Sequence, residues 1–125
     1  NGYWVSHAGS VAAVNGPYTP YTMFALPASA GPKIYRHVVN PHMFIYQFCK
    51  EIWIIAKLKH FDSASVADDR NWLYFAPVRP PFQDPPEQGW CAAPGIFAKG
   101  TPIPELQVHF FSERSGEGSV SLWAI

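Results

Sequence analysis

Five histidines are the residues of this chain best suited to acid–base chemistry. They are His7, His37, His42, His60 and His109. Nucleophilic catalysis needs a nucleophile, a base and an orienting group in contact with one another. No G-x-S-x-G elbow or catalytic-cysteine signature accompanies the histidines, and Ser6 and His7 should point to opposite faces of a strand. We therefore expect a protein that is not an enzyme, and a small hydrolase or metal-dependent enzyme is the second alternative.

Metal coordination is another chemistry that these side chains allow. His37 and His42 lie five residues apart, and His60 precedes Asp62, so folding could assemble a His-His-Asp site. No metal-ligand spacing in the sequence demands such a site. Surface or half-buried histidines are the simpler expectation.

Carboxylates and thiols add little to the metal hypothesis. Asp62, Asp68 and Asp69 lie close together in the sequence, but without an EF-hand pattern they favour a solvated acidic loop over a loose calcium site. Cys49 and Cys91 form no C-x-x-C pair. We expect two buried thiols, with one disulfide as the alternative, and no metal or other cofactor.

Exposed tryptophans could stack on the apolar C–H faces of sugar rings. The chain contains five of them, Trp4, Trp53, Trp72, Trp90 and Trp123. Most should be core residues, because Trp supplies a large buried area in β domains. Trp90 follows a proline-rich stretch and is the one we expect to be exposed, while Trp72 has polar neighbours in the sequence. Carbohydrate binding is therefore the first alternative function.

Two segments suit docking to another protein. The first is the proline-rich stretch 77–86, which contains Arg79, Pro80, Pro81 and Phe82. A stiff extended segment loses little entropy on binding, although the same stretch is equally compatible with a loop packed on its own domain. The second is a terminal strand, Ser119–Ile125, whose Trp123 lies near the end of the chain. Such a strand can complete its own sheet or extend the edge of a neighbour.

The composition is rich in aromatic residues and poor in charge. Charged residues make up 14% of the chain, against about 25% in a typical soluble domain. Nine Phe, six Tyr and five Trp take their place, which suggests that a partner covers some aromatic surface. With a net charge of zero and no basic run, we expect no nucleic-acid partner. No apolar run reaches the length of about 18 residues that a membrane span needs.

Short apolar segments that are bounded by proline and glycine must position the candidate side chains described above. Thirteen prolines and nine glycines divide the chain, and the runs between them are rich in β-branched and aromatic residues, which favour strands over helices. We predict a single all-β domain over residues 1–125, with an irregular Pro/Gly-rich segment at 77–104. The predicted fold is an antiparallel meander of seven to nine short strands, with little or no helix, curling into a small barrel or sandwich.

The clearest predicted unit is a β-hairpin over residues 43–58. Met43–Phe48 and Ile52–Leu58 flank a three-residue turn, Cys49-Lys50-Glu51. Period-two alternation gives both arms two largely apolar faces, so the hairpin should be central or covered on both sides. One continuous helix over these residues is the rival interpretation. The other predicted strands are Tyr3–His7, Lys33–Val39, Trp72–Ala76, Trp90–Ala92, Leu106–Phe111 and Ser119–Ile125.

The opening Tyr3-Trp4-Val5-Ser6-His7-Ala8-Gly9, followed by Val14-Asn15-Gly16-Pro17-Tyr18, resembles a small β-rich module of large multidomain proteins of algae and protists. Further matching elements are Ile34-Tyr35, Ile52-Trp53-Ile54, Leu73-Tyr74-Phe75, Gly89-Trp90 and Gly100-Thr101-Pro102-Ile103-Pro104. The resemblance covers roughly residues 3–106 and implies a compact module for architecture or recognition, without a catalytic motif. The segments 20–32 and 59–71 and the extra C-terminal strands depart from its pattern.

The leading functional prediction is a non-catalytic protein-interaction or structural module, an accessory subunit of a larger assembly with a protein partner. Because the chain begins at Asn1 rather than Met, we expect a processed product or a piece of a longer protein. No residue pattern indicates a compartment.

Overall fold

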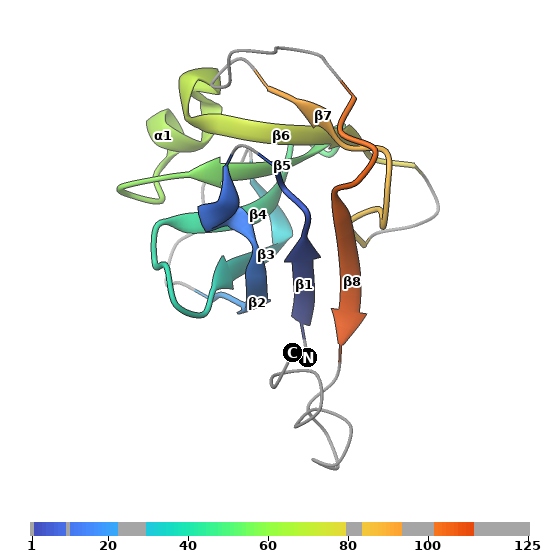
Figure 1. Ribbon diagram of the computed structural model, residues 1–125. Coiled ribbons are helices and arrows are strands. Elements are labelled where there is room, and N and C mark those ends of the chain that lie inside the picture. The colour runs from blue at the N-terminus through green and yellow to red at the C-terminus, as the bar shows by residue number, and fades with distance from the viewer. Residues whose placement is uncertain (1, 10, 23–29, 80–83, 94–101, 112–125) are drawn as a thin grey trace.

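The strands form one curled antiparallel sheet, as the sequence predicts. The computed structural model describes residues 2–9, 11–22, 30–79, 84–93 and 102–111. Eight strands follow one another in the order β7-β6-β5-β4-β3-β2-β1-β8, and the sheet bends into a half-barrel (Figure 1). The strands are β1 Gly2–Ser6, β2 Gly16–Pro20, β3 Ala30–His37, β4 Met43–Phe48, β5 Ile52–Lys57, β6 Trp72–Pro77, β7 Cys91–Ala92 and β8 Gln107–Phe111.

Helical structure is limited to three short pieces of the described chain. They are the 3-10 turns η1 Ala12–Val14 and η2 Asp69–Asn71 and the helix α1 Ser63–Ala67. No helix in the described ranges has the length and apolar character needed to cross a bilayer. The meander prediction is confirmed for β1 to β7. The eighth strand returns to pair with β1, from Gly2 opposite Phe111 to Ser6 opposite Gln107.

The predicted hairpin at 43–58 is confirmed, and the helical alternative is wrong. β4 and β5 pair without interruption from Met43 opposite Lys57 to Phe48 opposite Ile52. Cys49 and Lys50 take positive φ angles of 54° and 61° in the turn between them. All β4 residues except Phe48 are buried, because the two faces of the hairpin contribute to two different apolar clusters.

The cysteines are free thiols that the structure keeps apart. Cys49 is exposed in the β4–β5 turn, and Cys91 is half-buried at the start of β7. The expectation of two buried thiols is therefore wrong for Cys49. Its position follows from the hairpin register, which places this residue at the solvent end of two long strands.

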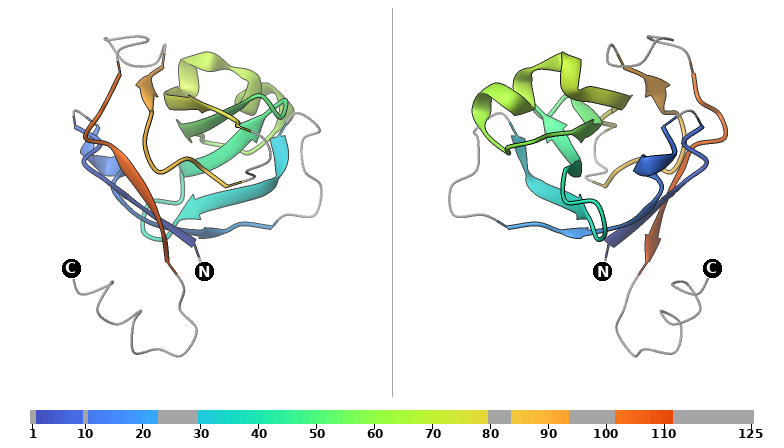
Figure 2. Two further views of the ribbon diagram at one scale, coloured as in Figure 1. Left: turned by 90° about the vertical axis from the view of Figure 1, so that its right-hand side faces the viewer. Right: turned by 60° about the vertical axis from the view of Figure 1, so that its left-hand side comes forward.

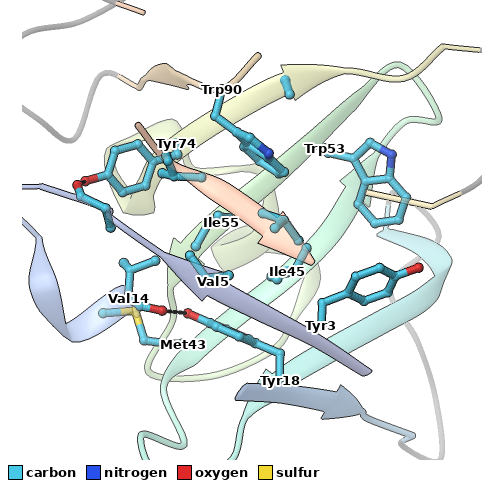
Figure 3. Packing of buried hydrophobic residues seen from close by; sticks show 14 of the residues in the cluster. Tyr3, Val5, Val14, Tyr18, Met43, Ile45, Trp53, Ile55, Tyr74 and Trp90 are labelled. Atoms are coloured by element: carbon cyan, nitrogen blue, oxygen red, sulfur yellow. Dashed lines mark hydrogen bonds between the residues drawn. The ribbon is translucent and has the colours of Figure 1, made fainter. Parts of the chain in front are cut away.

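The inner face of the curled sheet carries the larger of two apolar clusters, which we call the inner cluster (Figure 3). Two of its tyrosines anchor the connection between β1 and β2. The Tyr18 hydroxyl donates to the Val14 carbonyl at 2.6 Å, and the Tyr74 hydroxyl donates to the Ala8 carbonyl. Buried carbonyls of an irregular segment thus find partners, which a buried loop requires.

The outer face of β3, β4 and β5 carries a second apolar cluster, which we call the outer cluster. The connection between β5 and β6 covers it. Val66 of α1 is completely buried in it. The Val66 carbonyl accepts hydrogen bonds from the Tyr46 hydroxyl at 2.9 Å and from the Trp72 indole at 3.1 Å. Asp62 caps α1 by accepting from the Ser65 amide at 2.8 Å, and this hydrogen bond lowers the pKa of the Asp62 carboxyl. Both faces of the central hairpin are therefore covered.

His37 connects β2, β3 and the β3–β4 turn. Its Nδ1 accepts from the amides of Val39 at 3.0 Å and Asn40 at 3.1 Å, so the proton of the neutral ring belongs on Nε2. Nε2 lies 2.7 Å from the Asn15 carbonyl, to which it then donates. Gly16 has a φ of +129°, and a Cβ there would lie 2.6 Å from His37 Nε2.

The two ends of the sheet are joined by the segments that flank β7 and β8. The Ile103 amide donates to the Trp90 carbonyl at 2.8 Å, and the Val108 amide donates to the Glu87 carbonyl at 3.0 Å. Cys91 and Pro102 form an isolated antiparallel bridge. The views in Figure 2 show the resulting curl, in which β8 comes to lie beside residues 84–93.

Gly16→Ala should destabilise the fold more than Gly9→Ala. Both glycines have positive φ, 129° and 75° respectively, but no atom lies within 4 Å of a Cβ at Gly9. Gly9→Ala should therefore cost only the backbone strain of about 1–2 kcal/mol, whereas Gly16→Ala adds overpacking of about 1–3 kcal/mol against His37. Urea denaturation of the two variants measures the difference. Equal losses would contradict the role of His37.

Four tyrosine side chains should stay protonated at the pH at which free tyrosine ionises. Burial raises the pKa of Tyr3, Tyr18, Tyr35 and Tyr46. Because each folded pKa lies above the unfolded value of about 10, the free energy of unfolding should be constant below about pH 10 and fall as the pH rises above it. Tyrosinate absorbance followed beside near-UV circular dichroism tests this. Ionisation of all six tyrosines in a still-folded protein at about pH 10 would refute it.

Candidate functional site

A groove opens where the inner face of the half-barrel reaches solvent. It has a volume of about 360 Å³ and is lined by Tyr3, Asp84, Pro85, Glu87, Val108 and Phe110. These residues come from β1, from β8 and from the connection that precedes β7. We call this site the β1–β8 groove. It lies where residues 84–87 approach the edge of β8, next to the hydrogen bond from Val108 to Glu87.

Aromatic rings form one side of the β1–β8 groove. Tyr3 stands edge-on to Tyr35 at a centroid distance of 5.0 Å and to Phe110 at 5.7 Å. Figure 3 shows the hydroxyl end of Tyr3 directed away from the centre of the inner cluster. Phe110 is 63% exposed, whereas Val108, two residues earlier on the same face of β8, is 2% exposed. The inner face therefore ends at an uncovered ring.

Two carboxylates, Asp84 and Glu87, also line the groove. Asp84 accepts from the Lys33 ammonium at 3.3 Å, and Glu87 Oε2 lies 3.8 Å from His109 Nδ1. All four side chains are substantially exposed, so these contacts contribute little to stability. Burial raises the pKa of Tyr3 and Tyr35, and the Asp84 carboxylate adds to both shifts. The two phenols thus stay neutral beside the carboxylates and can donate hydrogen bonds.

The backbone edge of β8 also faces this groove. Along an antiparallel strand, successive residues direct their N–H and C=O groups to opposite edges. The Val108 amide points to residue 87, so the amide and carbonyl of Phe110 point to the same side. Within the described ranges no backbone hydrogen bond is formed by Phe110 on that side. The groove therefore offers an aromatic ring, carboxylates and a strand edge together.

The expectation that Trp90 is exposed is wrong. Trp90 is 1% exposed, belongs to the inner cluster and donates its indole N–H to the Pro86 carbonyl at 2.8 Å. Trp72 is half-buried against Phe48 at a centroid distance of 5.3 Å. Neither residue lines the β1–β8 groove.

The predicted docking segments have mixed outcomes. Arg79 is exposed, while Pro80, Pro81, Phe82 and Trp123 lie outside the described residues. The proline-rich stretch 77–86 nevertheless supplies Asp84 and Pro85 to the groove. Its described C-terminal part packs on the domain, since Pro85 is buried. Phe110 and Glu87 were missed, although the prediction of a strand at Leu106–Phe111 placed Phe110 on the correct element.

The histidines have separate partners in the described structure. His37 bonds Asn15, His42 Nδ1 lies 3.2 Å from the Leu58 carbonyl, and His109 Nε2 lies 2.6 Å from Gln107 Oε1. No group of three His, Cys, Asp or Glu side chains that could hold a metal occurs within the described ranges. The arrangement of His37, His42, His60 and Asp62 considered from the sequence is therefore not assembled.

The acidic loop has structural tasks. Asp68 accepts from the Arg70 amide and from its guanidinium at 2.8–3.0 Å, and these hydrogen bonds lower the pKa of Asp68 to about 2. Asp62 caps α1. Two of the three carboxylates considered for a loose calcium site thus stabilise local turns of the chain.

Comparison of the chain with protein-family models, curated proteins and solved structures finds no match in any of the three. The resemblance to the algal and protist module therefore stays a prediction. The geometry of the β1–β8 groove is the basis for the functional inference that follows.

Trp90→Ala should unfold the protein more readily than Trp72→Ala. Removing a completely buried indole from a core leaves a cavity and costs about 3–5 kcal/mol, whereas Trp72 is half-buried at the edge of the outer cluster. Urea midpoints of the two variants measure the difference. A Trp90→Ala variant as stable as the native chain would contradict its place in the core.

Proposed function

We propose that this protein is a non-catalytic interaction module that binds a partner protein at the β1–β8 groove, as an accessory part of a larger assembly. The observation that supports the proposal most directly is the 63% exposure of Phe110 at the end of an otherwise buried face. Exposed aromatic residues set in a hollow beside polar groups are typical of the residues that dominate binding energy at protein interfaces.

The side chains of the groove are preorganised for such a contact. Tyr3 is held by Tyr35 and packs on Phe110, so little side-chain freedom is lost on binding. Covering the exposed part of the Phe110 ring would contribute about 1–2 kcal/mol. Val38 and Val39 are also exposed, at 51% and 79%, but they lie in the β3–β4 turn and line no described hollow. Single exposed aliphatic residues of this kind are ordinary.

Phe110→Ser should weaken partner binding and leave the fold intact, because most of this side chain faces solvent. The matched control is Val39→Ser, which removes a more exposed apolar side chain away from the groove. Proteins retained from the native source by the immobilised native chain are identified by mass spectrometry, and each is then produced pure. Calorimetric titration of the pure partner should give at least about a tenfold loss, or 1.4 kcal/mol, for Phe110→Ser alone.

Two results would contradict the proposal. One is a pure partner that binds Phe110→Ser as tightly as the native chain. The other is equal loss in Phe110→Ser and Val39→Ser, which would indicate a general effect on the fold instead of a contact at the groove.

Carbohydrate binding is the second candidate, because an exposed ring beside carboxylates also suits a sugar. The Phe110 ring could stack on a pyranose face while Asp84 and Glu87 accept from its hydroxyls. This version moves the sugar site from Trp72 and Trp90 to the groove. A glycan array probed with the native chain and with Phe110→Ser tests it: binding that disappears in the variant supports it, and absence of any binding refutes it.

A further inference from the structure

We propose that the β1–β8 groove takes a short extended peptide segment that pairs with the edge of β8 at Phe110 and inserts one arginine or lysine side chain between Asp84 and Glu87. This inference rests on the proposed function and names the chemistry of the partner. Three independent features of the groove support it: its charge, its rings and its strand edge.

The charge of the groove favours a cation. Among the described residues that line it, two carry carboxylates and none is basic. Lys33 contacts Asp84 at 3.3 Å but does not line the groove. Among the described residues, the ion-pair contact of Glu87 is the 3.8 Å approach of its Oε2 to His109 Nδ1. A cationic side chain entering here would meet two exposed carboxylates, one beside His109 and one that it can share with Lys33.

The rings suit the rest of such a side chain. Arginine and lysine carry aliphatic stems that pack on apolar surface while the charged group reaches polar partners. Phe110 is exposed and Tyr3 lies against it, and both rings line the same groove as the carboxylates. A guanidinium or ammonium above an aromatic face is further stabilised by the ring quadrupole. The same chain already contains this contact elsewhere, where the Arg36 guanidinium lies 4.6 Å from the Tyr21 ring centre.

The strand edge determines the conformation of the segment. The Phe110 amide and carbonyl face the groove, and residue 87 occupies the corresponding side of Val108. A peptide can therefore continue the edge of β8 beyond residue 87 by a short run of antiparallel or parallel pairing. With a rise of about 3.3 Å per residue, a groove of about 360 Å³ accommodates one or two side chains. We expect recognition of a short motif with one basic residue.

Selection from a display library of random dodecapeptides on the immobilised native chain tests this inference. Arginine or lysine should dominate one position, with an apolar or β-branched neighbour two residues away on the same face of the strand. The selected peptide is then synthesised in two forms, with the basic residue and with glutamine in its place. Fluorescence anisotropy should show at least about a tenfold weaker affinity for the glutamine form.

Substitutions in the groove provide the matching half of the experiment. Glu87→Gln and Asp84→Asn remove one carboxylate charge each with little change in shape, and each should weaken the basic peptide about tenfold. The glutamine form should be affected little by either. Glu51→Gln and Asp69→Asn remove the same charges from exposed residues outside the groove and should change nothing. The affinity of the basic peptide should fall with added salt.

The outcomes separate this inference from the proposed function. If the selected peptides lack a basic residue, or none is enriched, while Phe110→Ser still loses the native partner, the inference is wrong and the protein-binding proposal stands. If Phe110→Ser keeps its partner, both are wrong. Glycan binding that depends on Phe110, with no peptide enriched, would overturn the inference in favour of the carbohydrate candidate.

Discussion

The β4–β5 hairpin is apolar on both faces, and the rest of the fold follows from the need to cover them. Met43, Ile45, Trp53 and Ile55 face the inner cluster, so the sheet curls over them and brings β1, β6 and Trp90 together. Phe44, Tyr46 and Ile54 face outward, so the connection from residue 58 to residue 72 folds back as a cover. A sheet with one wet face would need neither the curl nor the cover. The groove is a result of the curl, because it forms where the bent sheet ends.

Local chemistry was sufficient to predict most of the described strands and the meander from β1 to β7, but not the return of β8. The hairpin is readable because β-branched and aromatic residues alternate over two runs of six residues joined by a short turn. Pairing of β8 with β1 joins residues about a hundred positions apart, and many other strands of similar composition could have taken that edge. No local pattern distinguishes among them. The structure resolves the choice through Tyr3 and Val5, whose inward side chains meet Phe110 and Val108 across the pair.

The site was harder to predict than the fold because exposure is a property of the assembled sheet. Trp90 follows prolines and a glycine, which usually indicate a surface loop, yet the hydrogen bond from Ile103 to its carbonyl draws this segment across the end of the inner cluster. Phe110 has the composition of a core residue and is exposed only because the inner face ends one residue pair beyond Val5 and Val108. Asp84 and Glu87 become neighbours of these rings through the same crossing segment. Their sequence context indicates only a polar, proline-rich connection.

In the described part of the chain, the seam of the half-barrel is held by the backbone hydrogen bonds from Ile103 to Trp90 and from Val108 to Glu87 and by the Cys91–Pro102 bridge. Local opening of the sheet is expected at this seam before it occurs between β4 and β5, which pair without interruption from Met43 to Phe48. A molecule bound between residues 84–87 and β8 would contact both sides of this seam. Binding in the groove and the free energy of unfolding of the whole sheet are therefore thermodynamically linked. An accessory module of this kind would be more stable when bound to its partner than when free.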